Sequence, residues 1–99
     1  GVDISNDDGT PIEATAAGVV SFAGVAGGYG ELVEINHGNG FVTRYGHASV
    51  LLVSEGMKIT KGQTIALMGS SGKSTGSHTH YEVDINGTPV DPMLFLPIQ

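Results

Sequence analysis

Residues 78–85 read His78-Thr79-His80-Tyr81-Glu82-Val83-Asp84-Ile85, and charged or imidazole side chains occupy every second position. Successive side chains of a β-strand point to opposite faces of a sheet, so this period of two predicts a strand with one polar and one apolar face. The polar face is expected to carry His78, His80, Glu82 and Asp84. The apolar face is expected to turn Tyr81, Val83 and Ile85 toward the core.

Other parts of the chain have the same short, turn-bounded character. Further strands are indicated by apolar segments at 18–26, 31–36, 41–47 and 64–68. No window of about eleven residues keeps an apolar period of 3.6, so almost no helix is expected.

Two Asn-Gly dipeptides mark the turns between strands. Asn39-Gly40 lies between two apolar segments, and Asn86-Gly87 follows residues 78–85. Asn-Gly readily adopts the positive φ angles of a two-residue hairpin turn, so the first dipeptide predicts a hairpin. We therefore predict an all-β fold, a small antiparallel sheet with long Gly- and Ser-rich loops at 24–30 and 69–77 that border a groove.

Length and composition limit the kinds of function. Ninety-nine residues fit one small domain, which we place at residues 1–99. Ten acidic and four basic residues leave a formal charge of −6, which argues against a nucleic-acid partner because few cations are available to neutralise phosphates. The chain has no cysteine, so any metal must be held by His and carboxylate side chains. No apolar run approaches the roughly 20 residues of a membrane span, and we expect any targeting segment to lie outside this sequence.

The polar face of the predicted strand opens with two histidines, His78 and His80. Two imidazoles that project the same way from one strand, after a Gly- and Ser-rich loop, can share a small metal or catalytic site. A His-x-His pair on an exposed strand face is also often only solvated. Spacing alone leaves both interpretations open.

Two further residues are candidates for the same site. His47 ends the segment 41–47, whose odd positions are expected to share one face, and Gly46 before it would let a backbone or a substrate approach closely. Asp3 lies between apolar neighbours and needs a cation, a turn amide or solvent as its partner. Each residue by itself is weak evidence for a site.

Ordered motifs run along nearly the whole chain. They are Gly1-Val2-Asp3, Gly9-Thr10-Pro11-Ile12, Gly18-Val19-Val20, Tyr29-Gly30, His37-Gly38-Asn39-Gly40, Tyr45-Gly46-His47, Lys61-Gly62-Gln63, Ser74-Thr75-Gly76-Ser77-His78-Thr79-His80 and Val90-Asp91-Pro92. In this order the motifs resemble those of the M23 zinc metallopeptidases, the lysostaphin- and LytM-type cell-wall endopeptidases.

The resemblance implies roles for four residues. Asp3 and His80 match the positions of zinc ligands, and His47 and His78 match the unligated catalytic histidines. The first zinc ligand of the family is a His four residues before the Asp, a position two residues upstream of Gly1. We expect the parent polypeptide to continue upstream and supply this His, because degenerate relatives generally lose several site residues together and all four are present here.

The resemblance also implies an activity. It implies a zinc metalloendopeptidase of the cell envelope, periplasmic or secreted, that hydrolyses peptide cross-links of bacterial peptidoglycan through a metal-activated water. Its partners would be peptide stems and cross-bridges, and an inhibitory or targeting segment upstream is a further hypothesis. The alternative is a non-catalytic cell-envelope module of the same fold that binds peptidoglycan or activates an amidase. A His two positions before Gly1 would favour the enzyme, and a residue that cannot bind metal would favour the module.

Three other interpretations carry less weight. His37 precedes the predicted hairpin and is interpreted as a turn histidine rather than a ligand. Residues 69–74 look like a phosphate loop, but two residues separate their glycines where that motif needs four. Residues 55–63 are similar to turns of biotinyl and lipoyl carrier domains, but the lysine-bearing hairpin of those domains is missing.

Overall fold

The computed structural model describes residues 2–5, 9–69 and 78–90, with side chains at 9–69 and 80–90. Within these ranges the fold is all-β, apart from one short 3-10 helix, η1 (Gly27–Tyr29). No helix in the described ranges is long and apolar enough to cross a membrane. The strands are β1 (Val2–Ser5), β2 (Pro11–Glu13), β3 (Gly18–Val25), β4 (Glu31–Gly38), β5 (Phe41–Leu51), β6 (Lys58–Ile59), β7 (Thr64–Met68), β8 (His78–Ile85) and β9 (Thr88–Val90).

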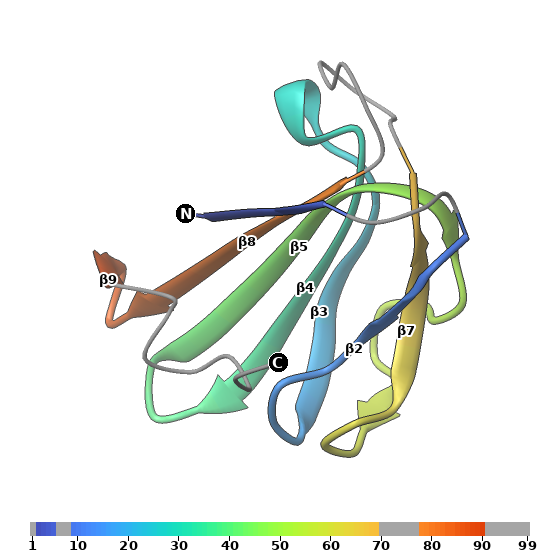
Figure 1. The fold of residues 1–99 in the computed structure, drawn as a ribbon. Helices are drawn as coiled ribbons and strands as arrows, with labels where there is room; N and C mark the ends of the chain where they lie inside the picture. The colour runs from blue at the N-terminus through green and yellow to red at the C-terminus, as the bar shows by residue number, and fades with distance from the viewer. Residues whose placement is uncertain (1, 6–8, 70–77, 91–99) are drawn as a thin grey trace.

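The strands join into one curled antiparallel sheet with the order β1-β8-β5-β4-β3-β6, to which β7, β2 and β9 are added (Figure 1). The long strand β5 pairs with β8 through residues 41–46 and with β7 through residues 48–51. The sheet therefore curls around the core, with β1 and β8 along one side of the view and β2 and β7 along the other. The point at which β5 changes partner is His47.

Both Asn-Gly dipeptides form tight turns. Asn39 and Gly40 have φ angles of 54° and 79° and close the predicted hairpin between β4 and β5. Asn86 and Gly87, with φ angles of 52° and 80°, join β8 to β9 in the same way. The backbone N–H of Asn86 donates to the carbonyl of Gly40 at 2.8 Å, so the two turns support each other.

The inner face of the curled sheet holds the core. Its largest fully buried side chains are Val20, Val33, Ile35, Thr43, Tyr45, Ile65, Tyr81 and Val83. Burying one such apolar side chain stabilises the fold by about 1.5–3 kcal/mol.

The buried hydroxyl groups of the core have partners. Thr15 Oγ1 lies 3.1 Å from the Tyr45 hydroxyl and 3.0 Å from the Tyr81 hydroxyl, and Thr43 Oγ1 donates to Tyr45 at 2.9 Å. The two tyrosines therefore bury their rings without leaving their polar ends unsatisfied.

The predicted fold class and the five predicted strands are confirmed. The short strands β1, β2, β6 and β9 were not predicted, because two to four residues are too few to show an alternation. Ile85 was expected to face the core but is 37% exposed, because β8 ends there and the core stops before the Asn86 turn. The loop at 24–30 contains η1, whereas residues 70–77 of the second predicted loop lie outside the described ranges.

Candidate functional site

His47 lies at an irregularity of β5. It stands between Gly46, which pairs with His80 of β8, and Ala48, where β5 begins to pair with β7. On the other edge of β5 the register with β4 shifts at the same place, so β5 carries one extra residue here. His47 has a φ of 63°, an uncommon value for a residue other than glycine. This arrangement is a β-bulge, which re-aims the side chain that it carries.

The bulge turns His47 toward His80. Strict alternation from the buried Tyr45 would place His47 on the core face. Instead the His47 and His80 ring centroids lie 6.3 Å apart, at an interplanar angle of 75°, and both rings line one pocket. The expectation that all odd positions of 41–47 share a face is therefore wrong at His47, because the positive φ interrupts the alternation.

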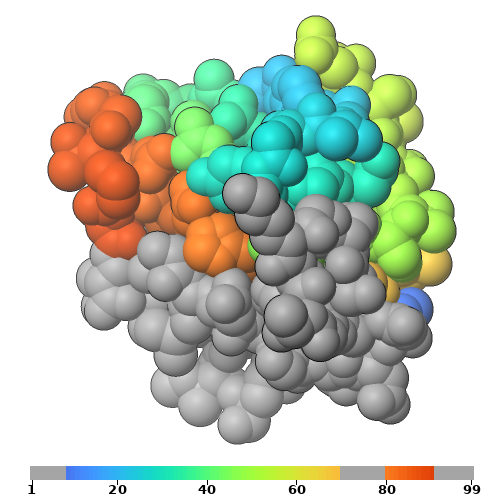
Figure 2. All heavy atoms as spheres, turned by 90° about the horizontal axis from the view of Figure 1, so that it is seen from above, coloured from blue at the N-terminus to red at the C-terminus, as the bar shows by residue number. Residues whose placement is uncertain are grey.

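The pocket has a volume of about 300 Å³. It is lined by Gly28, Tyr29, His47, His80 and Glu82. His47 is only 9% exposed, so the pocket offers one largely buried imidazole beside a more open one. Figure 2, which looks at the molecule from above, shows the chain around η1 in cyan beside the described start of β8 in orange.

Tyr29 reaches this site because Gly46 leaves room for it. A Cβ atom at position 46 would lie 3.1 Å from Tyr29 Cδ1 and 3.4 Å from the backbone oxygen of Tyr29. The close approach of another backbone that was predicted at Gly46 is therefore confirmed, and the Tyr29 ring approaches with it. The Tyr29 hydroxyl donates to Glu82 Oε2 at 2.7 Å, and its ring centroid lies 5.9 Å from that of His80. The hydrogen bond to Glu82, together with burial, raises the pKa of Tyr29 above its ordinary value.

Glu82 also binds His80, its neighbour on the polar face of β8. His80 Nε2 lies 2.8 Å from Glu82 Oε2. An ionised carboxylate can only accept hydrogen bonds, so Nε2 of His80 carries the proton of this contact. In a neutral His80 ring the lone pair is therefore on Nδ1.

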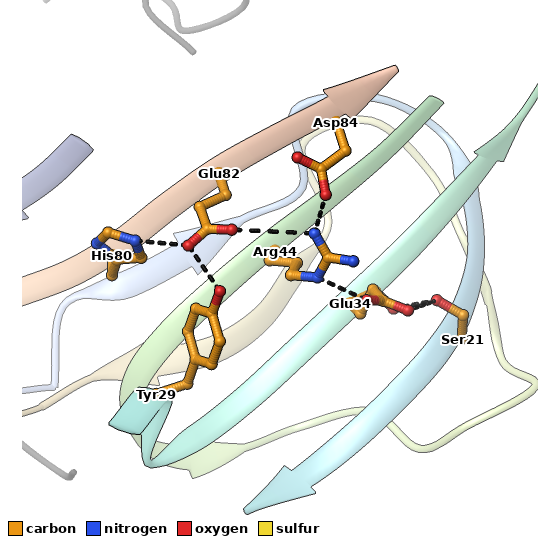
Figure 3. A network of polar contacts seen from close by, with 7 residues as sticks. All are labelled: Ser21, Tyr29, Glu34, Arg44, His80, Glu82 and Asp84. Atoms are coloured by element: carbon orange, nitrogen blue, oxygen red, sulfur yellow. Dashed lines mark hydrogen bonds and ion pairs between the residues drawn. The ribbon is translucent and has the colours of Figure 1, made fainter. Parts of the chain in front are cut away.

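A row of charged side chains continues from Glu82 across the sheet (Figure 3). Arg44 of β5 stands directly opposite Glu82 of β8 and Glu34 of β4. Its Nη1 lies 3.9 Å from Glu82 Oε1 and donates to Asp84, and its Nε donates to Glu34 at 2.7 Å. Ser21 of β3 donates to Glu34 at 2.8 Å. Burial by itself lowers the pKa of Arg44, but the hydrogen bond to Asp84 and the charge of Glu34 raise it overall.

The structure brings two of the four predicted site residues together, His47 and His80. Asp3 stands directly opposite His80 in the pairing of β1 with β8, but its side chain lies outside the described ranges. His78 begins β8 two residues before His80, and its side chain also lies outside them. Among the residues that the structure does describe, no group of three or more His, Cys, Asp or Glu side chains is arranged to hold a metal.

Comparison with known proteins identifies the family. The family model described as Peptidase family M23 matches residues 1–92. The chain belongs to peptidase family M23. A DD-carboxypeptidase/endopeptidase of Neisseria meningitidis is 47% identical over 93 residues, which are 94% of this chain and 21% of that protein. A peptidoglycan DD-endopeptidase of Vibrio cholerae is 42% identical over 93 residues, 94% of this chain and 22% of that protein.

A solved structure shares the M23 fold. The crystal structure of a zinc-containing peptidase from Vibrio cholerae superimposes with a TM-score of 0.90 at 36% identity, covering 94% of this chain and 29% of that one. The chain thus spans about a fifth of the length of the curated relatives above.

Sequence reasoning did not place three residues in or beside this pocket: Tyr29, Arg44 and Glu82. Glu82 was predicted on the polar face of residues 78–85, two positions after His80, and this spacing was an available signal. Tyr29 and Arg44 come from other elements, and no spacing along the chain relates them to His80. His37 lies in β4, near its end, rather than in the turn, and its ring contacts Ala17 and Thr43 away from the pocket.

Proposed function

We propose that this M23 chain, residues 1–99, is the catalytic domain of a zinc metalloendopeptidase that hydrolyses peptide cross-links of bacterial peptidoglycan. The observation that carries the proposal is the meeting of His47 and His80 at one pocket, with a carboxylate hydrogen-bonded to His80 Nε2. His47 and His80 come from different strands, and a bulge directs His47 to the pocket. If the His-x-His pair of β8 were only solvated, no such convergence with a histidine of β5 would be needed.

The residues fit a catalytic zinc site. His80 and Asp3 are directly opposite in adjacent antiparallel strands, where Cα atoms lie about 4.5–5.5 Å apart. We propose them as two ligands, together with a His four residues before Asp3. Two His and one Asp are a donor set that leaves a position open for water. When bound, zinc would lower the pKa of that water from about 15.7 toward roughly 7 and polarise the scissile carbonyl.

His47 and His78 would handle protons without binding the metal. A ring nitrogen of His47, at the wall of the pocket, can take a proton from the attacking water or give one to the leaving amine. Register places His78 opposite Ser5, at the same end of β8. The bulge sets the direction in which His47 leaves β5, so that its ring lines the pocket before substrate binds.

Peptidoglycan is the substrate that the relatives support. The Vibrio cholerae relative named above is a peptidoglycan DD-endopeptidase. The pocket has a volume of about 300 Å³, and Gly28 in its wall adds no side chain, which leaves room for a peptide stem. We place the protein in the cell envelope, where this substrate occurs.

The proposal is tested by digesting purified peptidoglycan with the full-length protein and with a form trimmed upstream of the M23 region. Products are read by mass spectrometry, with and without a zinc chelator. We expect chelator-sensitive loss of cross-linked muropeptides. His80→Ala should abolish both zinc binding and activity, whereas His47→Ala should keep zinc and lower turnover by about 10²- to 10⁴-fold.

Glu55→Gln, in an exposed turn, serves as the matched control and should cleave like the wild type. Cross-links that stay intact with folded, zinc-loaded protein would refute the enzyme. That result would instead support the non-catalytic module that binds peptidoglycan or activates an amidase.

A further inference from the structure

The carboxylate of Glu82 is held from three sides. It accepts from His80 Nε2 at 2.8 Å and from the Tyr29 hydroxyl at 2.7 Å, both at Oε2. Its other oxygen, Oε1, lies 3.9 Å from Arg44 Nη1. The three partners come from β8, η1 and β5, so the carboxylate has little freedom to rotate away from His80 (Figure 3).

Arg44 is itself anchored. Asp84 and Glu34 bind it from the two neighbouring strands, and Ser21 donates to Glu34 at 2.8 Å. The Glu34, Arg44 and Glu82 positions are directly opposite one another across β4, β5 and β8. This row of polar side chains therefore runs from β3 across β4 and β5 to Glu82, which contacts the ring of His80.

We propose that Glu82 is a positioning residue for the metal site, which accepts the Nε2 proton of His80 so that this ring presents Nδ1 to zinc. Tyr29 and Arg44 hold the carboxylate in the orientation that this contact requires. A metal-binding His commonly donates its other ring N–H to a carboxylate, which fixes its tautomer and ring orientation. The inference rests on the proposed role of His80 as a zinc ligand.

The contact between His80 and Glu82 determines which way the His80 ring faces. Residues His80 and Glu82 are two apart on one strand face, where neighbouring side chains point the same way. Without the carboxylate, the imidazole would lose the contact that keeps the proton on Nε2 and holds the ring in this orientation. The proposed role of Glu82 is thus to remove conformations of His80 that cannot bind the metal, before the metal arrives.

Zinc affinity of the full-length protein tests this proposal directly. It is measured by competition with a chromogenic chelator for Glu82→Ala, Glu82→Gln, Tyr29→Phe and the control Glu55→Gln. We expect Glu82→Ala to weaken zinc binding by about 10- to 100-fold. Glu82→Gln keeps an acceptor oxygen and should restore most of that loss. Tyr29→Phe should cost about threefold to tenfold, as expected for one lost hydrogen bond to the carboxylate.

The absorption spectrum of the cobalt-substituted protein is the second measurement. Its ligand-field bands should change in Glu82→Ala and return toward the wild-type spectrum in Glu82→Gln, a result that a general loss of stability would not produce. Circular dichroism checks folding, and Tyr29→Phe decides the matter if Glu82→Ala does not fold.

Two outcomes separate this inference from the proposed function. If His80→Ala loses zinc while Glu82→Ala binds it within about twofold of Glu55→Gln, the positioning role is wrong and the ligand assignment stands. Where Glu82→Ala does not fold, the same result for Tyr29→Phe has the same meaning. If His80→Ala itself binds zinc as tightly as the wild type, the ligand assignment fails, and the positioning role fails with it.

Discussion

The two faces of β8 differ in how they are built. On the inner face, Tyr81 and Val83 are each 1% exposed and pack with Tyr45 and the rest of the core. On the outer face, the His80 and Glu82 side chains are 28% and 22% exposed and are connected by hydrogen bonds and charges. Residues adjacent in sequence are therefore held by different interactions: apolar burial on the inner face, and hydrogen bonds and charges on the outer face.

This difference separates stability from function along one strand. The inner face contributes burial, which depends on volume and not on charge. The outer face contributes mainly the orientation of the site side chains. Its ion pairs are about a quarter exposed to solvent, and such pairs stabilise a fold only weakly. Substitutions on the two faces should accordingly change different measurements.

The largest expected effect on stability comes from Tyr81→Ala. Removing this ring should lower the free energy of unfolding by about 3–5 kcal/mol, because it leaves a cavity beside Tyr45. His80→Ala, one residue earlier, should change it by less than about 1 kcal/mol. Urea unfolding monitored by circular dichroism measures both, and equal losses would contradict the separation of the two faces.

The next largest effect on stability is a pH dependence that comes from the ionisation of Tyr81. Burial raises the pKa of Tyr81 to about 12, against about 10 in an unfolded chain. The neutral phenol is thus favoured in the folded state, so its stabilisation is complete below pH 10 and is lost as the pH rises toward 12. Two pKa units correspond to about 2.7 kcal/mol.

The measurement is urea unfolding between about pH 9.5 and 12 for the wild type and Tyr81→Phe. The loss of stability over this range should be about 2–3 kcal/mol smaller in the variant. Parallel curves for the two proteins would mean that Tyr81 does not titrate with a raised pKa.

Arg44→Gln should have a smaller effect, of about 1 kcal/mol at low salt. It leaves the carboxylates of Glu34, Glu82 and Asp84 without their shared cation. Raising the ionic strength to about 1 M shortens the screening length to about 3 Å and should recover part of the loss. Lys61→Gln, at an exposed turn, is the control and should respond little; a loss that salt does not change would point to packing instead.

The smallest effect is expected at the end of the inner face. Ile85→Thr should cost about 0.5 kcal/mol or less, because Ile85 is already 37% exposed. The same kind of change at Val83 should cost about 1–3 kcal/mol, because it buries a hydroxyl group. Thermal unfolding of the two variants measures the difference, and similar melting temperatures would show that the core extends to the Asn86 turn.

Much of the fold could be predicted because its signals are local. An alternation of eight residues in β8 and a two-residue Asn-Gly turn each depend only on neighbours along the chain. The motifs likewise placed His47 and His80 among the site residues before any geometry was known. The short strands escaped prediction because β1 and β6 are defined by the partner strand that they meet, and not by their own few residues.

The sequence by itself determined the period of two that makes the sheet, the hairpin at Asn39-Gly40 and the identity of the histidines. Only the tertiary structure decided where His47 points, because an extra residue in β5 is visible only against the register of β4. It also decided that Tyr29 and Arg44 hold Glu82, since these residues are far apart in sequence and meet through strand pairing. Local backbone preferences act between neighbours, whereas hydrogen-bond register and side-chain contacts across strands exist only once the sheet has formed.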